Sequence, residues 1–197
     1  LLGLFDMAGK GVSAALATSL ISSFFSTLQA AGILAGLGMA RLMAMLHQHI
    51  QSALGDSMFL ACAFAVGEPR TVRALEAEAS ARLTPEAVNA AKSAAAIMGM
   101  NNVYYRSLHL MHNAEYKTLP ARLRMNILAN PGAPKVEYEL WCTAVSAING
   151  CGACIDAHEK TLREHGVSNV QVQASLRIAA VVNAISRVLA AEAASAD

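Results

Sequence analysis

The amino-acid sequence predicts an all-α protein, and three of its features support that prediction. Hydrophobic residues make up 55% of the 197 residues, largely Ala, Leu and Val, whereas aromatic residues make up only 5%. Alanine is the best helix former, and sheet proteins use more branched and aromatic side chains. Apolar residues recur at helical spacing between capping residues, and no stretch shows convincing strand alternation.

The first part of the chain predicts two helices, over residues 12–30 and 39–53, ended by Gly55-Asp56. Residues 11–40 contain no charged side chain, and a bilayer span needs roughly 20 apolar residues. However, many Ser, Thr and Gly residues interrupt this run, so a buried helix followed by a Gly-rich turn explains it as well. We therefore expect no membrane span.

The middle of the chain predicts further helices. A short apolar run, 58–66, stops at Gly67-Glu68-Pro69, and residues 71–83 alternate apolar and charged side chains at helical spacing. Thr84 is a suitable N-cap and Pro85 a suitable first residue for the next helix. We expect that helix to run through Ile97.

The run 98–102 contains Gly99 and should break or kink the chain before another helix over 102–111. Residues 119–128 predict a further helix, ended by Asn130-Pro131-Gly132. Pro134 then opens a helix that ends near Ile148.

Asn149-Gly150 predicts a sharp interruption directly before Cys151. The segment 151–165 predicts a helix, with Glu159 and Arg163 paired one turn apart and Gly166 as its C-terminal cap. Ser168 begins a last helix. Its expected apolar face consists of Ala174, Ile178, Val181, Val182, Ile185 and Leu189.

The charge balance and the cysteine content exclude several classes of function. The chain has 15 basic and 14 acidic residues, so no strong field attracts nucleic acid or anionic lipid. It has four cysteines, too few for a secreted disulfide scaffold. Two of them, Cys151 and Cys154, have the Cys-x-x-Cys spacing that indicates redox or metal chemistry in a reducing compartment. We therefore expect a cytoplasmic protein that does not bind nucleic acid.

Cys151, Cys154 and His158 fall on a single face if they share one helix. The free N–H groups and the positive dipole end at a helix start stabilise a thiolate and lower its pKa. His158, one turn beyond Cys154, could accept its proton or pair with the thiolate. A thiolate attacks peroxide and becomes a sulfenic acid, which a second thiol converts to a disulfide. The sequence thus predicts thiol-dependent peroxide reduction.

Three alternatives compete with this prediction. The cysteines could form half of a zinc site, with His158 as third ligand and His165 or Cys142 as fourth, although no second Cys-x-x-Cys exists. A c-type haem site needs His directly after the second cysteine, where this chain has Ile155. Both cysteines could also be small core residues.

Three long runs resemble the alkyl hydroperoxidase D (AhpD) family. They are Ile97–Arg106 (IMGMNNVYYR), Leu123–Gly132 (LRMNILANPG), and Glu139-Leu140-Trp141 followed by AVSAINGC at 144–151. The resemblance covers residues 61–197. It implies the all-α helical bundle of carboxymuconolactone decarboxylase-like proteins, with the Cys-x-x-Cys at a helix N-terminus and a homotrimeric assembly.

The resemblance also implies an activity. Family members reduce hydroperoxides with electrons from the dihydrolipoyl group of a lipoyl-bearing dehydrogenase-complex subunit, and pass electrons to an AhpC-type peroxiredoxin. The resemblance implies that no cofactor or metal is bound. By position, Cys154 matches the cysteine that forms the sulfenic acid and Cys151 its partner thiol, while His158 and Glu139 match a proton relay. Some members carry another His where this chain has Ala153.

The remaining candidates have ordinary explanations. We expect Cys142 to be structural. Met98, Met100, Tyr104 and Tyr105 should belong to the core, and His109, His112 and His165 to the surface.

Residues 1–60 form an atypical hydrophobic segment with a different resemblance. The run Phe5–Leu16 (FDMAGKGVSAAL) and Asp56-Ser57-Met58-Phe59 resemble metal-dependent serine phosphatases of the sporulation (PPM) type, in which the Asp is a metal ligand. One Asp, here Asp6, cannot hold the two-metal centre that phosphoester hydrolysis uses, so we expect no phosphatase activity. Two alternatives to the peroxidase are a non-redox decarboxylase-like enzyme, and an interaction module with a remnant phosphatase segment.

Overall fold

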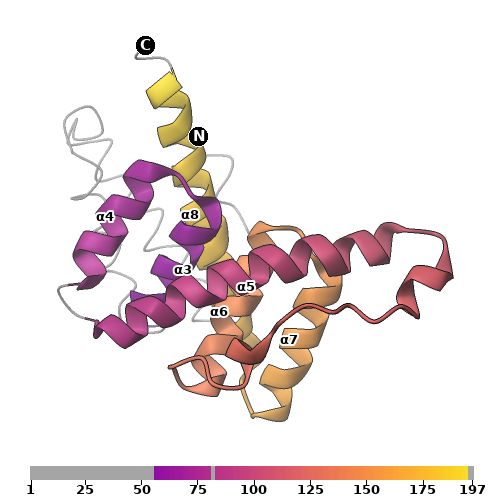
Figure 1. The fold of residues 1–197 in the computed structure, drawn as a ribbon. Helices are drawn as coiled ribbons and strands as arrows, with labels where there is room; N and C mark the ends of the chain where they lie inside the picture. The colour runs from indigo at the N-terminus through magenta and orange to yellow at the C-terminus, as the bar shows by residue number, and fades with distance from the viewer. Residues whose placement is uncertain (1–55, 81–82, 195–197) are drawn as a thin grey trace. The chain divides into compact units, whose positions relative to one another are not determined.

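The structure is a computed structural model that describes residues 56–80 and 83–194, and in these ranges it is helical without strands (Figure 1). The predicted helices 12–30 and 39–53, and Asp6, lie outside the described residues. The helices are α3 (Asp56–Val66), α4 (Pro69–Ser80), α5 (Pro85–Leu110), α6 (Lys135–Ile148), α7 (Gly152–Glu164) and α8 (Asn169–Ala194), with short 3₁₀ turns η3 (Ala114–Lys117) and η4 (Asn126–Leu128). The all-α prediction is confirmed.

Helix α3 lies at the centre of the described bundle. Met58, Leu60 and Cys62 are fully buried, and so are Ala61 and Ala63. A helix that is apolar all round needs neighbours on every side, and α3 packs against α4, α5, α6 and α8. The short apolar run in the sequence is therefore the core helix.

The start of α4 depends on Glu68. Its carboxylate accepts hydrogen bonds from the backbone N–H of Arg70 at 3.0 Å, and from the N–H and hydroxyl of Thr71 at 2.6 and 2.7 Å. Burial raises the pKa of Glu68, but these bonds outweigh it and the net shift is downward. The Ser186 hydroxyl of α8 reaches the Thr71 hydroxyl at 3.1 Å, which ties α4 to α8.

Helix α5 corrects one prediction. It runs unbroken from Pro85 to Leu110, with Thr84 as its N-cap, although we expected a break or kink at 98–102. A glycine inside a helix costs only about 1 kcal/mol relative to alanine. Ile97, Met98, Asn101 and Asn102 are all buried on neighbouring helices, and this packing outweighs the local preference of Gly99.

The connection between α5 and α6 corrects a second prediction. Residues 119–128 contain only the three-residue turn η4 instead of a helix, and every residue from 111 to 120 is exposed. An isolated helix shorter than about 12 residues is marginal in water unless it buries an apolar face. This segment buries no such face against the described residues, and it lies outside the bundle in Figure 1.

The last helices follow their predicted positions. Pro134 is the N-cap of α6, Gly166 has a positive φ of 76° just after α7, and the Arg163–Glu159 ion pair is present at 3.0 Å. In the described part of the chain, α8 alone is long and apolar enough to cross a bilayer. A core helix of a soluble protein meets the same criterion, so this is weak evidence for a span.

Candidate active site

The turn between α6 and α7 places the two cysteines. Helix α6 ends at Ile148, and Gly150 has a φ of 69°, a conformation that glycine adopts without steric cost. The Cys151 N–H donates to the Ser146 carbonyl at 3.0 Å. Cys151 is therefore the N-cap of α7, one residue before the helix, whereas we expected it within the helix.

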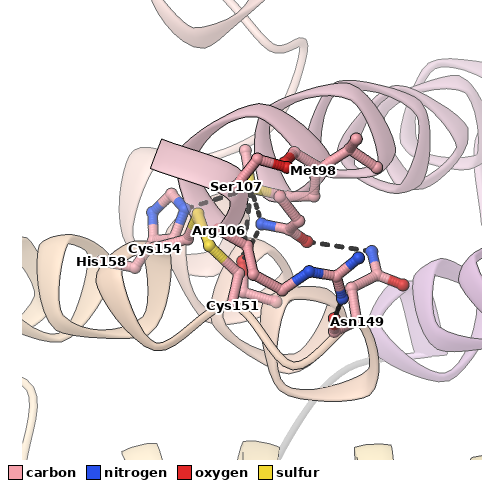
Figure 2. The surroundings of a disulfide bond; sticks show 10 residues. Met98, Arg106, Ser107, Asn149, Cys151, Cys154 and His158 are labelled. Carbon is pink, nitrogen blue, oxygen red and sulfur yellow. Dashed lines mark hydrogen bonds between the residues drawn. A yellow bond between two sulfur atoms is a disulfide. The ribbon is translucent and has the colours of Figure 1, made fainter. Parts of the chain in front are cut away.

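Cys151 and Cys154 form a disulfide, with Cα atoms 5.3 Å apart (Figure 2). The N–H groups of Cys154 and Ile155 donate to the Cys151 carbonyl at 3.1 and 3.0 Å, so the pair lies in the first turn of α7. Cys151 is fully buried, and 6% of Cys154 is exposed. The free N–H groups at a helix start favour a thiolate once the bond is reduced.

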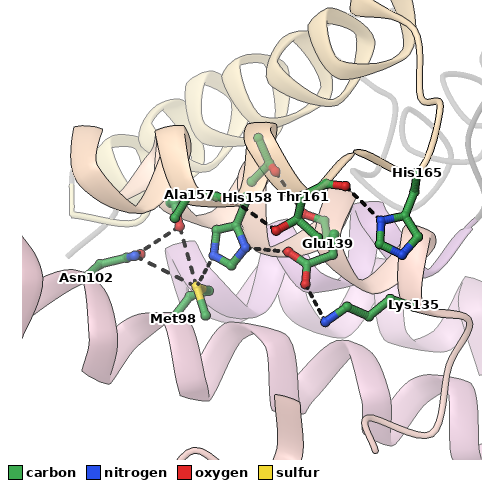
Figure 3. Close-up of polar contacts among 10 residues, drawn as sticks. Met98, Asn102, Lys135, Glu139, Ala157, His158, Thr161 and His165 are labelled. Carbon is green, nitrogen blue, oxygen red and sulfur yellow. Dashed lines mark hydrogen bonds and ion pairs between the residues drawn. The ribbon is translucent and has the colours of Figure 1, made fainter. Parts of the chain in front are cut away.

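His158 and Glu139 form a close pair beside the disulfide. The Nδ1 atom of His158 lies 2.6 Å from Oε2 of Glu139, and Lys135 Nζ contacts the other carboxylate oxygen at 2.9 Å (Figure 3). Burial raises the pKa of the Glu139 carboxyl, but the hydrogen bonds and charges of His158 and Lys135 outweigh it, so the net shift is downward. Glu139 is thus held as a carboxylate against the imidazole.

The other ring nitrogen of His158 faces α5. Its Nε2 atom lies 3.2 Å from the sulfur of Met98, which is almost completely buried. The Ser146 hydroxyl also reaches that sulfur at 3.5 Å. Figure 3 shows His158 between Glu139 and Met98, and Figure 2 shows it beside Cys154, one helical turn earlier.

A second set of bonds from α5 holds the turn before Cys151. The Asn102 side chain donates to the Ser146 hydroxyl at 2.9 Å and accepts from the Asn149 amide at 2.9 Å. Arg106 donates from its guanidinium to the Asn149 carbonyl. Asn102 and Arg106 therefore fix the turn from which α7 begins.

The structure thus places Cys151 and Cys154 at the start of α7, and it pairs His158, one turn after Cys154, with Glu139 on α6. Sequence reasoning did not identify a site role for Met98, Asn102 or Arg106. Their spacing of four residues places them on one face of α5, within a run that carries the family resemblance. Lys135 was also missed, although it stands one turn before Glu139.

The other sequence candidates lie as follows. Cys142 is buried, and His109, His112 and His165 are exposed, as expected. Met100, Tyr104 and Tyr105 are only half-buried, so of the expected core group Met98 alone is fully in the core. Among the described residues, no group of three His, Cys, Asp or Glu side chains is placed to hold a metal ion.

A helical domain with a disulfide-forming Cys-x-x-Cys at the start of a helix, next to a buried Glu–His pair, defines a thiol-dependent oxidoreductase. The chain is 66% identical over 138 residues to the alkyl hydroperoxide reductase AhpD of Hyphomonas neptunium, covering 70% of the chain and 77% of that protein. It is 68% identical over 134 residues to the protein of the same name from Maricaulis maris, covering 68% and 78%. For Caulobacter vibrioides the identity is 61% over 137 residues, covering 69% and 75%.

The sequence profile of the Carboxymuconolactone decarboxylase family matches residues 114–197. The chain therefore belongs to the alkyl hydroperoxide reductase AhpD family, as the resemblance in the sequence predicted.

The N-terminal resemblance is confirmed as well. The profile of the Stage II sporulation protein E (SpoIIE) family matches residues 1–110, so the chain also carries sequence of that family. The matches to the AhpD proteins are longer than residues 114–197 and thus include residues before 114. The two resemblances therefore overlap, and α3 and α5, which pack on α6, lie within the range of the sporulation profile.

Proposed function

We propose that this chain is a lipoyl-dependent peroxidase that reduces hydroperoxides with the Cys151–Cys154 dithiol. The observation that supports this most directly is the disulfide at the start of α7 beside the Glu139–His158 pair. A disulfide that closes within one helical turn forms and opens without unfolding the domain. The names of the relatives agree with such an activity.

The reaction that we propose balances in three steps. The Cys154 thiolate attacks one peroxide oxygen, the O–O bond breaks, and the alkoxide leaves and takes a proton to become an alcohol. The Cys154 sulfenic acid then reacts with the Cys151 thiol, which forms the disulfide and releases water. A donor dithiol finally reduces the disulfide and becomes a disulfide itself, so that two electrons and two protons return to the cysteines.

The roles of the two cysteines follow from their positions. Cys154 is the more exposed of the pair and lies one turn before His158, so we assign to it the attack on peroxide. Cys151 is fully buried and suits the resolving thiol, which only has to reach Cys154.

His158 and Glu139 would supply the proton transfers. Glu139, held as a carboxylate by Lys135, orients the His158 ring and stabilises its charged form. Where some relatives of this fold carry an additional His, this chain has Ala153, so the relay here is shorter or runs through water.

The electron donor and partner follow from the resemblance. We propose that a dihydrolipoyl group on a dehydrogenase-complex subunit reduces the disulfide, and that an AhpC-type peroxiredoxin accepts electrons from the dithiol. A dithiol enzyme of this kind needs no bound cofactor and works in a reducing compartment, which favours the cytoplasm. We further propose a homotrimer.

The disulfide also bears on the two alternative functions. A non-redox decarboxylase-like enzyme would not need both cysteines, whereas here they are paired. An interaction module would not need the buried Glu139–His158 pair beside them. The redox assignment is therefore the one that accounts for all four residues.

The test is peroxide consumption coupled to NADH through lipoamide dehydrogenase and lipoamide. We expect turnover in the parent protein and a loss to background in Cys154→Ser, because a hydroxyl does not form a sulfenic acid. Cys142→Ala removes a buried thiol outside the pair and should keep the activity. A fully active Cys154→Ser variant would refute the dithiol mechanism. An inactive parent that still transfers electrons to the peroxiredoxin would leave only the adaptor role.

A further inference from the structure

Both ring nitrogens of His158 face atoms that only accept hydrogen bonds. Nδ1 lies 2.6 Å from the Glu139 carboxylate, and Nε2 lies 3.2 Å from the Met98 thioether sulfur. Neither an ionised carboxylate nor a thioether carries a hydrogen to donate. Because two facing lone pairs repel, each of these contacts is favourable only if the ring nitrogen carries a proton.

The ionised carboxylate of Glu139 supports a proton on Nδ1 of His158. Lys135 holds one carboxylate oxygen at 2.9 Å, and the pKa of Glu139 is lowered despite its burial, which opposes ionisation. The carboxylate therefore accepts from Nδ1. Even if a proton moved from Nδ1 to Glu139, the contact with Met98 would still require a proton on Nε2.

The Met98 sulfur is fixed as an acceptor by its surroundings. It is 1% exposed, so its side chain has no room to turn away. The Asn102 amide donates to the Ser146 hydroxyl at 2.9 Å, and that hydroxyl in turn donates to the sulfur at 3.5 Å. The hydrogen bonds therefore run in one direction, from Asn102 on α5 to Ser146 on α6 and from Ser146 to the Met98 sulfur on α5. His158 on α7 reaches the same sulfur.

We propose that Met98 is a positioning residue that keeps a proton on Nε2 of His158 while Cys151 and Cys154 are joined as a disulfide. This inference rests on the proposed function and adds a defined state to it. When a donor thiolate attacks the disulfide, the S–S bond breaks, one cysteine stays bound to the donor as a mixed disulfide, and the other is released as a thiolate that needs a proton. The second sulfur of the donor then displaces the bound cysteine, so that both cysteines are reduced and the donor is oxidised to a disulfide. We assign the proton for the released thiolate to the His158 ring, which lies one turn after Cys154 on α7 (Figure 2).

The test is the protonation of His158 itself, measured near neutral pH. Long-range ¹H–¹⁵N NMR spectra of the ¹⁵N-labelled protein in its disulfide form distinguish a protonated from an unprotonated ring nitrogen, and a His158→Gln spectrum identifies the signals. We expect Nε2 of His158 to carry a proton in the parent. In Met98→Leu, which keeps the volume and removes the acceptor, we expect a loss of the Nε2 proton.

A matched control comes from the same helix. Met100→Leu makes the same chemical change at a half-buried position and should leave the His158 signals unchanged. An unprotonated Nε2 in the parent would overturn the proposal even if Met98→Leu failed to fold, and so would a folded Met98→Leu variant that retains the Nε2 proton. Because this measurement needs no turnover, an inactive enzyme with a protonated ring would refute the peroxidase function and leave the role of Met98 intact.

Discussion

All four cysteines are buried, but their surroundings divide them into two kinds. Cys62 and Cys142 are free and buried, and loss of hydration raises the pKa of the Cys62 thiol to about 12 and that of Cys142 still further, with the nearby Glu139 charge adding to the shift there. Thiols in such surroundings stay protonated and are poor nucleophiles. Cys151 and Cys154 lie instead at the start of a helix, where a thiolate is favoured. Redox chemistry is therefore confined to this pair.

Removing the charge of Glu139 should slow the reaction. In Glu139→Gln the side chain keeps its shape, but the His158 imidazolium loses the carboxylate that stabilises it. Positioned acid–base groups contribute roughly 10²–10⁴-fold to a rate, so we expect peroxide turnover to fall about 10²-fold. The coupled NADH assay measures this. Glu137→Gln, an exposed change two residues earlier on α6, should remain close to the parent, and equal activity in both variants would contradict the relay.

The same variant should change the response of the fold to acid. The pKa of Glu139 is lower in the folded protein than its ordinary value of about 4.3, so its ionised form stabilises the fold above that pH. This contribution is lost as the pH falls through the lower, folded-state pKa. The free energy of unfolding of the parent should therefore drop more steeply on acidification than that of Glu139→Gln, as urea titrations at each pH would show. Parallel curves would contradict the assignment.

Sequence reasoning found the site residues whose chemistry is explicit, namely the two cysteines, His158 and Glu139. It did not find Met98, because a methionine in an apolar helix usually belongs to the core, and nothing in the sequence shows that its sulfur meets an imidazole. Lys135 was missed for a similar reason. An exposed lysine gains a role only when the carboxylate one turn away is directed at a histidine.

At the scale of elements, the sequence predicted helices well where an apolar face is buried and poorly elsewhere. Helix α5 continues past Gly99 because the residues just before and after it in the sequence, Ile97, Met98, Asn101 and Asn102, are buried against neighbouring helices. The segment 119–128 has favourable helix spacing but no surface among the described residues to pack on, so it is irregular apart from η4. In both cases contacts with other helices decided the structure, and a local sequence pattern does not reveal such contacts.

Two glycines should respond in opposite ways to alanine. Gly99 lies inside α5, and no atom lies within 4 Å of the position that an added methyl group would take, so Gly99→Ala should raise the free energy of unfolding by about 0.5–1 kcal/mol. Gly150 has a φ of 69°, which alanine adopts only with strain, so Gly150→Ala should lower it by about 1 kcal/mol or more. Urea unfolding compares the two. A destabilising Gly99→Ala would show that the exposed face of α5 is covered in the assembled protein.

At the scale of the whole described domain, α4, α5, α6 and α8 pack around α3 and α7 packs on α5 and α6, while the connection between α5 and α6 remains outside. That connection exposes large apolar side chains that nothing in the described chain covers, including Tyr116 and Leu119 at 46% and 58% exposure. Exposed apolar side chains gathered in one segment are typical of a surface that binds another protein. They suit the proposed homotrimer, in which a neighbouring copy would cover them.

The trimer predicts a clear effect of a charge in this segment. Leu119→Asp should dissociate the assembly, because a buried carboxylate without a partner is costly at an interface. Sedimentation velocity would show a trimer for the parent and a smaller species for the variant. Lys160→Asp on the exposed face of α7 also introduces an acidic residue and should leave the assembly unchanged. A monomeric parent would contradict the trimer directly.

The near-complete burial of the Cys151–Cys154 disulfide limits which reductants can reach and reduce it. A reductant must bring its own sulfur into line with the S–S bond, and here only a small part of Cys154 meets solvent. A slender dithiol on a flexible arm, such as a lipoyl group, reaches this bond more readily than a thiol held flat on a folded surface. Between two donors of equal reduction potential, the shape of the donor rather than its driving force would then set the rate, so that the site discriminates among the cell's thiols by access alone.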